Sequence, residues 1–467
     1  MLAWSPGTKG RPVTAQAIIL PKFADSTEFV RWLPQARGKI VLLSPAWPTC
    51  RPSEDWFRWS TPESRARIDS AITAMQADWS SDPRDSTKLY RGTGKSMGLG
   101  TGTLGMRLEQ AGVAGLITSR LKQGGYGAGG GGGFGGPPGG GRAPSAGSMR
   151  GGGPAASVTA NAPRPPQGSG GWGTVEVFET YNTVAPAVTL SCEDYSLIYR
   201  LAENNQRPMV RLDLDGELLG EVPAFNTLGT IKGSEKPDEY VMLSAHFDSW
   251  DGSSGATDNG TGTLMMMEAM RILKKVYPNP KRTIMVGHWS SEEQGLNGSR
   301  AFATDHPEVL KGLQALFNQD NGTGRVQNVS ASGLTAIGPH LRDWYGKLPS
   351  FFTDSLSPNV VSWAFNDTPV GNPGGTDGAV FACYGTPSFG MGALNWNYGT
   401  YTWHTNRDTY DKVVWDDLRH NAVLVAMMTY LASEDPQFID RTKSPGTWPA
   451  NWPDNCGGAP RKTRPRY

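Results

Sequence analysis

The stretch YVMLSAHFDSWDGSSGATDNGTGT, residues 240–263, decides the fold of this chain. It begins with an apolar run at 240–245 that predicts a buried strand, and it continues through small and polar residues into a segment with helical spacing. In that segment Met266, Met270 and Leu273 recur on one helix face, which is typical of a helix that packs on a core. A strand followed by a helix in this way predicts a βαβ unit.

Two further apolar runs lie downstream, TIMVGHW at 283–289 and GLQALFN at 312–318. All three runs are followed by polar residues, and these are His246, Glu292, Glu293 and Asp320. Parallel strands of a doubly wound sheet end at one edge, and ligands bind beyond those ends. We therefore predict an α/β catalytic domain over residues 187–440, with these side chains close together.

A larger set of residues in Gly-rich turns is expected to converge there: His246, Asp258, Glu292, Glu293, Asp320 and His404. Carboxylates that converge on one crevice repel each other, and bound cations relieve that repulsion. Imidazole and carboxylate ligands without thiolate suit zinc or another borderline divalent ion. Three ligating carboxylates and one hydroxide carry a charge that two divalent ions neutralise, so we expect two ions, as in hydrolases that activate water between them.

Three kinds of role can be assigned to the acidic residues. Asp258 is best placed to bridge the ions, because it precedes a predicted helix whose N-terminus favours an anion. Asp248 lies two residues after His246, on the same side of a continuing strand, so its carboxylate can accept the second imidazole N–H. Glu292 and Glu293 are adjacent, and in an extended segment they point apart, so one is expected to bind metal and the other to act as general base.

The first part of the chain, residues 1–185, predicts a small α+β domain, because short strand-like runs alternate with turns and helix-like stretches. Within it, residues 124–173 are rich in Gly and Pro and too poor in apolar residues to offset chain entropy. We expect this tract to be a disordered insertion. Residues 441–467 are expected to form a C-terminal tail.

Composition and charge exclude several classes of protein. Lys and Arg number 44 against 43 Asp and Glu, so a net charge of +1 gives no bulk attraction to nucleic acid. The apolar runs are too short to span a membrane, and no signal peptide is readable at the N-terminus. Four scattered Cys do not form a disulfide scaffold or a metal knuckle, and they leave both disulfides and free thiols open.

The segments AHFDSWD, GATDNGTG, SSEEQG and HTNRDT resemble those of the zinc-dependent exopeptidases that include secreted aminopeptidases and plasma glutamate carboxypeptidase. The likeness runs from about 187 to 432, and HFDSWDGSSGATDNGTG is most similar to the carboxypeptidase Q branch. It implies a phosphorylase/hydrolase-like three-layer domain with a mixed central sheet, interrupted by a protease-associated (PA) domain that residues 1–185 resemble. Relatives have a catalytic segment before that insertion, and we expect it to be missing here.

The resemblance also implies a role for each residue of the site. The implied zinc ligands are His246, Asp258 and Asp320 for one ion and Asp258, Glu293 and His404 for the other. Glu292 is then the general base for a metal-bound hydroxide that attacks a peptide carbonyl. This chain departs from the pattern at one point, because some relatives stabilise the oxyanion with a Tyr shortly before the segment that matches GGTDGAVF, and none is found there. We therefore expect the metals alone, or Tyr398 or Tyr401 by proximity in sequence, to stabilise the oxyanion.

We expect a secreted or periplasmic exopeptidase whose substrates are dipeptides or short peptides, and whose partner, if it has one, is a second copy in a homodimer. Amino- and carboxypeptidase polarity both stay open. Two other hypotheses compete with this one: a catalytically inactive, receptor-like relative of the same fold, and a mononuclear zinc acyltransferase similar to glutaminyl cyclase. Bound zinc per chain separates the three.

Overall fold

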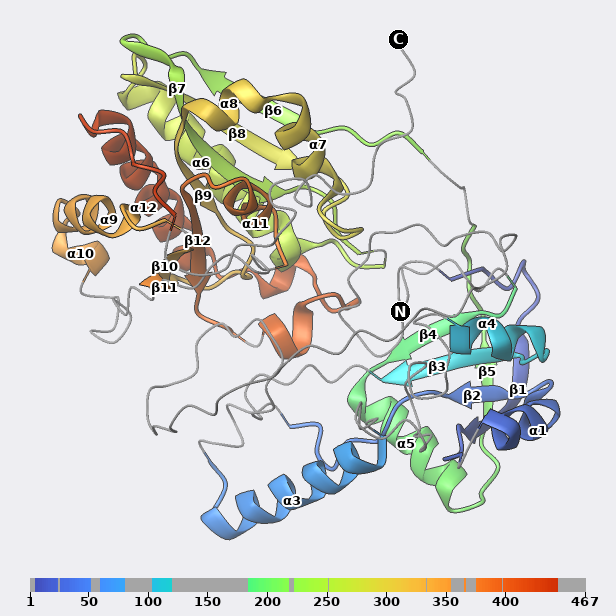
Figure 1. Cartoon of the computed structure of the whole chain (residues 1–467). Coiled ribbons are helices and arrows are strands. Elements are labelled where there is room, and N and C mark those ends of the chain that lie inside the picture. The colour runs from blue at the N-terminus through green and yellow to red at the C-terminus, as the bar shows by residue number, and fades with distance from the viewer. Residues whose placement is uncertain are drawn as a thin grey trace, which may run out of the picture.

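The computed structural model describes residues 5–23, 26–51, 59–79, 103–119, 184–217, 222–250, 252–332, 334–353, 365–366, 375–396 and 398–443. These residues form two β-sheets, one of five strands and one of seven (Figure 1). The tract 124–173 and all but the first residues of the tail predicted at 441–467 lie outside the described residues.

The smaller sheet has the strand order β4 (Ala187–Leu190), β3 (Gly115–Ser119), β2 (Ile40–Leu42), β1 (Val13–Ile19) and β5 (Met209–Leu212). The first four of these run parallel, and β5 is antiparallel to β1. Side chains of α1 (Ser26–Ala36) and α4 (Thr103–Gln110) cover one face, whereas α3 (Pro62–Trp79) and α5 (Cys192–Glu203) cover the other. Both faces of this sheet are therefore buried under helices.

This sheet continues further along the chain than the sequence predicts. The expected boundary near residue 185 does not coincide with the division between the sheets, because β4, α5 and β5 belong to the first one. Their placement depends on pairing with distant strands, which local periodicity does not reveal. A disulfide between Cys50 and Cys192 also ties the start of α5 to the segment that follows β2.

The larger sheet has the order β11 (Phe365–Asn366), β10 (Val326–Ser332), β12 (Ser388–Ala393), β9 (Leu313–Asn318), β7 (Lys236–His246), β8 (Arg282–Trp289) and β6 (Thr227–Ile231). Its central strands β12, β9, β7 and β8 are parallel. Antiparallel pairs, β10 with β12 and β6 with β8, flank them on the two sides. The expectation of a mixed central sheet is thereby confirmed.

Helices cover both faces of the larger sheet and complete the three predicted layers (Figure 1). One face packs on α6 (Thr261–Val276), α9 (Ile337–Gly346) and α12 (Trp415–Glu434). The other packs on α7 (Asn297–Asp305), α8 (Pro307–Gly312) and α11 (Gly378–Cys383). Residues of β7 alternate between these two cores, as the period of a strand requires: Val241 and Leu243 join the first, and Met242 joins the second.

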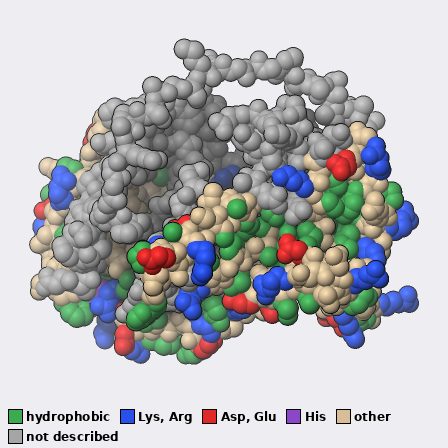
Figure 2. Space-filling view, turned by 90° about the horizontal axis from the view of Figure 1, so that it is seen from below, with side chains coloured by type: hydrophobic (Ala, Val, Ile, Leu, Met, Phe, Trp, Pro, Cys, Tyr) green, Lys and Arg blue, Asp and Glu red, His purple; other side chains and the backbone are tan. Residues whose placement is uncertain are grey.

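The surface agrees with the balanced composition. On the face in Figure 2, basic and acidic side chains are dispersed among hydrophobic and neutral ones. Of the helices in the described residues, none combines the length and the apolar character needed to cross a bilayer.

Candidate metal centre

The predicted site residues gather at the carboxyl ends of β7, β8 and β9. His246 is the last residue of β7, and Asp320 comes two residues after β9. Asp258 lies in the short helical turn η1 (Ala256–Gly260) that leads into α6, as expected for a residue before a helix. His404 follows another short helical turn, η2 (Tyr398–Thr402). Together with the turn after β8, which carries Glu292 and Glu293, five separate segments deliver side chains to one place.

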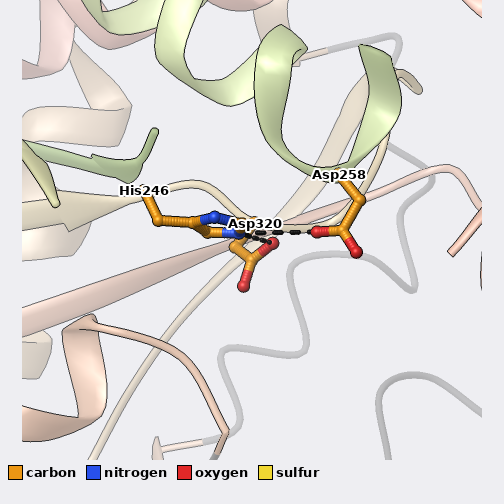
Figure 3. Close-up of side chains that lie close together, drawn as sticks. All are labelled: His246, Asp258 and Asp320. Atoms are coloured by element: carbon orange, nitrogen blue, oxygen red, sulfur yellow. Dashed lines mark hydrogen bonds and ion pairs between the residues drawn. The ribbon is translucent and has the colours of Figure 1, made fainter. Parts of the chain in front are cut away.

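Asp258 lies between two groups of potential metal ligands. Its Oδ1 is 3.4 Å from His246 Nε2, which in turn is 3.2 Å from Asp320 Oδ1 (Figure 3). Its Oδ2 is 3.3 Å from His404 Nε2, which is 3.0 Å from Glu293 Oε2. Each group could hold a metal ion, and the two share the Asp258 carboxylate.

The chemistry of these donors fits a divalent cation. Asp258 is 2% exposed and Glu293 is 7% exposed, so both carboxylates are withdrawn from water. Within the described part of the chain, Asp258 Oδ2 and Glu293 Oε1 accept no hydrogen bond. Buried charges in this state are costly unless a cation or a proton compensates them. Carboxylate oxygen together with imidazole nitrogen is a donor set that zinc accepts.

Without a cation the cluster is expected to retain protons. Burial raises the pKa of Glu292 well above its usual value, and the Asp320 and Asp377 carboxylates raise it further. Burial would lower the pKa of His246, but the carboxylates of Asp320 and Glu292 raise it well above its ordinary value. Metal binding would therefore displace protons, and metal affinity should weaken as the pH falls.

Asp248 supports the two glutamates rather than the His246 ring. Its Oδ1 accepts the backbone N–H of Glu292 at 3.0 Å, and its Oδ2 accepts that of Glu293 at 3.2 Å. His246 Nδ1 lies 2.9 Å from the backbone carbonyl oxygen of Asp248 but 3.8 Å from its carboxylate. The predicted carboxylate–imidazole bond is therefore corrected to a carbonyl contact, because β7 ends at His246 and does not continue to Asp248.

The two glutamates also differ from expectation. Residues 290–295 form a turn rather than an extended segment, and Ser291 has a φ of 56°. One carboxylate oxygen of Glu292, one of Glu293 and a ring nitrogen of His246 lie within 4.8 Å of one another. The expectation that the adjacent side chains point apart is wrong, because the chain turns as soon as β8 ends.

Two further residues hold the ligands from outside. The Asp408 carboxylate accepts the backbone N–H of Thr257 at 2.6 Å and that of Asp258 at 2.8 Å, which fixes the turn before α6. Trp250, which sequence reasoning missed, donates its indole N–H to Glu293 Oε2 at 2.6 Å. Its position inside the motif AHFDSWD is the signal that could have identified it.

Of the two tyrosines considered for the oxyanion, Tyr398 lies at the site. Its hydroxyl is buried, and burial followed by the charges of Asp258 and Asp320 raises its pKa well above the ordinary value, so it stays a proton donor. Tyr401 is 40% exposed, with its ring centre 4.7 Å from the Arg407 guanidinium. A cavity of about 280 Å³ adjoins both rings, and its other lining residues are Thr257, Thr323, Trp396, Thr402 and Lys412.

Residues 226–429 match the model of Peptidase family M28, and they contain every member of the two ligand groups. We call residues 226–429 the M28 domain, after the family that they resemble. Carboxypeptidase Q from Rattus norvegicus is 24% identical over 257 residues, which cover 55% of this chain and 52% of that protein. Carboxypeptidase Q from Bos taurus is 33% identical over 149 residues, which cover 31% of this chain and 32% of the bovine protein.

The chain thus spans about half the length of the rat protein and about a third of the length of the bovine one. Among solved structures, a peptidase M28 precursor from Shewanella amazonensis superposes with a TM-score of 0.55 at 18% identity. That superposition covers 94% of this chain and 77% of the other, and it shows a shared fold.

Proposed function

We propose that the M28 domain is a zinc-dependent exopeptidase that hydrolyses dipeptides or short peptides with two zinc ions. The observation that carries the proposal is the position of Asp258. It presents one oxygen to His246 and the other to His404, so that two ligand groups share one carboxylate. A carboxylate shared in this way would hold two ions close together, as in hydrolases that use two neighbouring metal ions.

Each ion would be held by one of the two groups. The proposed ligands are His246, Asp258 and Asp320 for one ion, and Asp258, Glu293 and His404 for the other. When bound, the ions would polarise the scissile carbonyl and lower the pKa of a water molecule towards neutrality. The three carboxylates and the two positive ions offset each other in a buried site.

Glu292 is proposed to move the proton. Its side chain is only 6% exposed and faces the site without belonging to either proposed ligand set. Burial raises its pKa well above the usual value of a glutamate, and a raised pKa makes the carboxylate a stronger base. It takes the proton from the attacking water and passes it to the amine nitrogen as the peptide C–N bond breaks. The bond from its N–H to Asp248 holds the turn that carries it.

Replacement of Glu292 tests this role. Glu292→Gln keeps the shape of the side chain and removes its basicity, so kcat/KM should fall by about 10²- to 10⁴-fold. Bound zinc should stay at the wild-type amount. The control is Glu308→Gln, an exposed glutamate that pairs with His306, and it should change neither quantity. Near-normal hydrolysis by Glu292→Gln would refute the assignment of the base.

The class of protein is tested by metal analysis of the zinc-supplied chain together with a dipeptide panel. Two ions per chain and hydrolysis support the proposal. One ion with acyl transfer favours the cyclase-like alternative, and no ion favours a binding relative. Substrates with blocked amino or carboxyl termini identify the polarity, because an exopeptidase must hold the free end next to the scissile bond.

We also propose that the protein acts outside the cytoplasm, in a periplasm or after secretion. The Cys50–Cys192 disulfide supports this, since disulfides persist in oxidising compartments. The likeness of the five-stranded domain to a PA domain and the homodimer stay predictions.

A further inference from the structure

Trp250 contacts two of the ligands proposed for one zinc ion. Its indole Nε1–H donates to Glu293 Oε2 at 2.6 Å, and its ring stacks on His404 with the ring centroids 4.4 Å apart and the planes at 25°. We propose that Trp250 is a positioning residue for the zinc site of Asp258, Glu293 and His404, and not for the site of His246 and Asp320. This inference deepens the proposed function and rests on it.

The surroundings of Trp250 make its bond to Glu293 hard to replace. The side chain is only 7% exposed, so water cannot easily take over the indole N–H. Trp403 also stacks on His404, with centroids 3.6 Å apart. Two rings at such distances must lie on opposite faces of the imidazole, which is therefore held between two indoles. Trp250 thus contacts both Glu293 and His404, whose Oε2 and Nε2 atoms lie 3.0 Å apart.

The other proposed site is held by different means. His246 Nδ1 contacts the backbone carbonyl oxygen of Asp248 at 2.9 Å, and the Thr263 hydroxyl donates to the His246 carbonyl at 2.6 Å. These contacts come from the backbone after β7 and from α6, and a change at Trp250 removes neither. The two zinc sites should therefore respond differently to one substitution, which a general loss of stability would not produce.

The experiment measures the zinc affinity of each site by competition with a chelator of known affinity. Trp250→Phe keeps a ring against His404 and removes the N–H, whereas Trp250→Leu removes both contacts. Loss of such an outer contact to a metal ligand costs about 10- to 100-fold in affinity. We expect Trp250→Phe to lower the affinity for one of the two zinc ions by this factor and to leave the affinity for the other unchanged. Trp250→Leu should lower the affinity for the same ion further.

The matched control is Trp344→Phe. Trp344 is likewise buried in the M28 domain, and its indole N–H also donates to a carboxylate, Asp435 Oδ2 at 2.8 Å, but it contacts no proposed ligand. It should leave both zinc affinities unchanged. Melting temperatures of the zinc-free variants show whether each one is folded.

Two ligand variants identify which ion is affected. Asp320→Ala removes a ligand of the first ion, and His404→Ala removes a ligand of the second. Adding Trp250→Phe should lower the affinity for the one zinc ion that Asp320→Ala still binds. It should not change the affinity for the one zinc ion that His404→Ala still binds. An equal loss of affinity for both zinc ions, or no loss of affinity for either, overturns the role of Trp250. A wild-type chain that binds fewer than two ions overturns the two-ion function itself, and the inference with it.

Discussion

His288 is a buried histidine outside the metal centre. It precedes Trp289 on β8, so the two side chains face opposite sides of the sheet, and its ring lies 6.1 Å from that of Phe247. Neither of its ring nitrogens has a hydrogen-bond partner among the described residues. Burial lowers its pKa to about 4, so the imidazole stays neutral in the folded protein. The part of the chain that the structure describes offers its ring no partner that would stabilise a positive charge.

Because His288 stays neutral in the folded protein, we expect the protein to lose stability in acid. In the unfolded chain the imidazole has its ordinary pKa of 6.5 and takes up a proton as the pH falls below that value, while the folded chain does not until about 4. The free energy of unfolding should therefore decrease as the pH is lowered through this window, by on the order of 2 kcal/mol between pH 6.5 and 4.5. His288→Phe should abolish that part of the decrease.

The measurement is urea unfolding of wild type and His288→Phe at pH 7.5 and pH 4.5. The comparison at pH 7.5 reports the packing effect of the new ring, and the change between the two pH values reports the proton. If both proteins lose the same free energy of unfolding on acidification, His288 does not contribute.

At the scale of elements, one arginine joins two strands to the end of a helix. Arg282 begins β8 and is fully buried, and its Nε donates to Glu239 Oε2 on β7 at 2.6 Å. Its Nη1 donates to the backbone carbonyls of Ser433 at 2.8 Å and Asp435 at 2.6 Å, at the end of α12. The last carbonyls of a helix have no partner within the helix, so Arg282 satisfies them and fixes where α12 stops.

Arg282→Met should destabilise the M28 domain by about 3 kcal/mol, because it removes the buried donor to the carbonyls of Ser433 and Asp435 and leaves Glu239 with its pair to Lys236. The matched control is Arg419→Met on α12, whose guanidinium is largely exposed and pairs with Asp416. An exposed pair of this kind contributes at most about 1 kcal/mol. Chemical denaturation of both variants checks the difference, and equal losses would contradict the anchoring role of Arg282.

At the scale of the whole molecule, residues 124–173 interrupt the connection between two adjacent strands. β3 and β4 run parallel with Leu116 opposite Ala187, and the tract lies in the chain between them. Parallel neighbours need a crossover of roughly a dozen residues. After deletion of 124–173, residues 120–123 and 174–186 remain to make that crossover.

The deletion of 124–173 should therefore leave zinc content and kcat/KM within about twofold of wild type, since the composition of the tract offers little apolar surface to the core. Zinc analysis and dipeptide hydrolysis measure the outcome. An inactive but folded deletion variant would show that the tract takes part in the function.

The amino-acid sequence by itself determined the strands that carry the site. The apolar runs at 240–245, 283–289 and 312–318 predict β7, β8 and β9, because a strand buried on both faces needs only local apolar character. The meeting of His246 with Asp320 follows from the same pattern, since parallel strands end at one edge. By contrast, β12 escaped prediction, because Gly390 and Gly392 weaken its strand pattern.

Only the tertiary structure decided what happens after the strands end. Backbone turns set the direction of the Asp248 side chain and bring Glu292 and Glu293 together. They also bring Trp250 into contact with Glu293. Such turns are held by bonds between distant segments, and local periodicity carries no information about them. The same holds for β4 and β5, whose place in the first sheet depends on strands far away in the chain. Local sterics set the period of a strand, whereas long-range pairing sets its neighbours and the aim of the side chains beyond it.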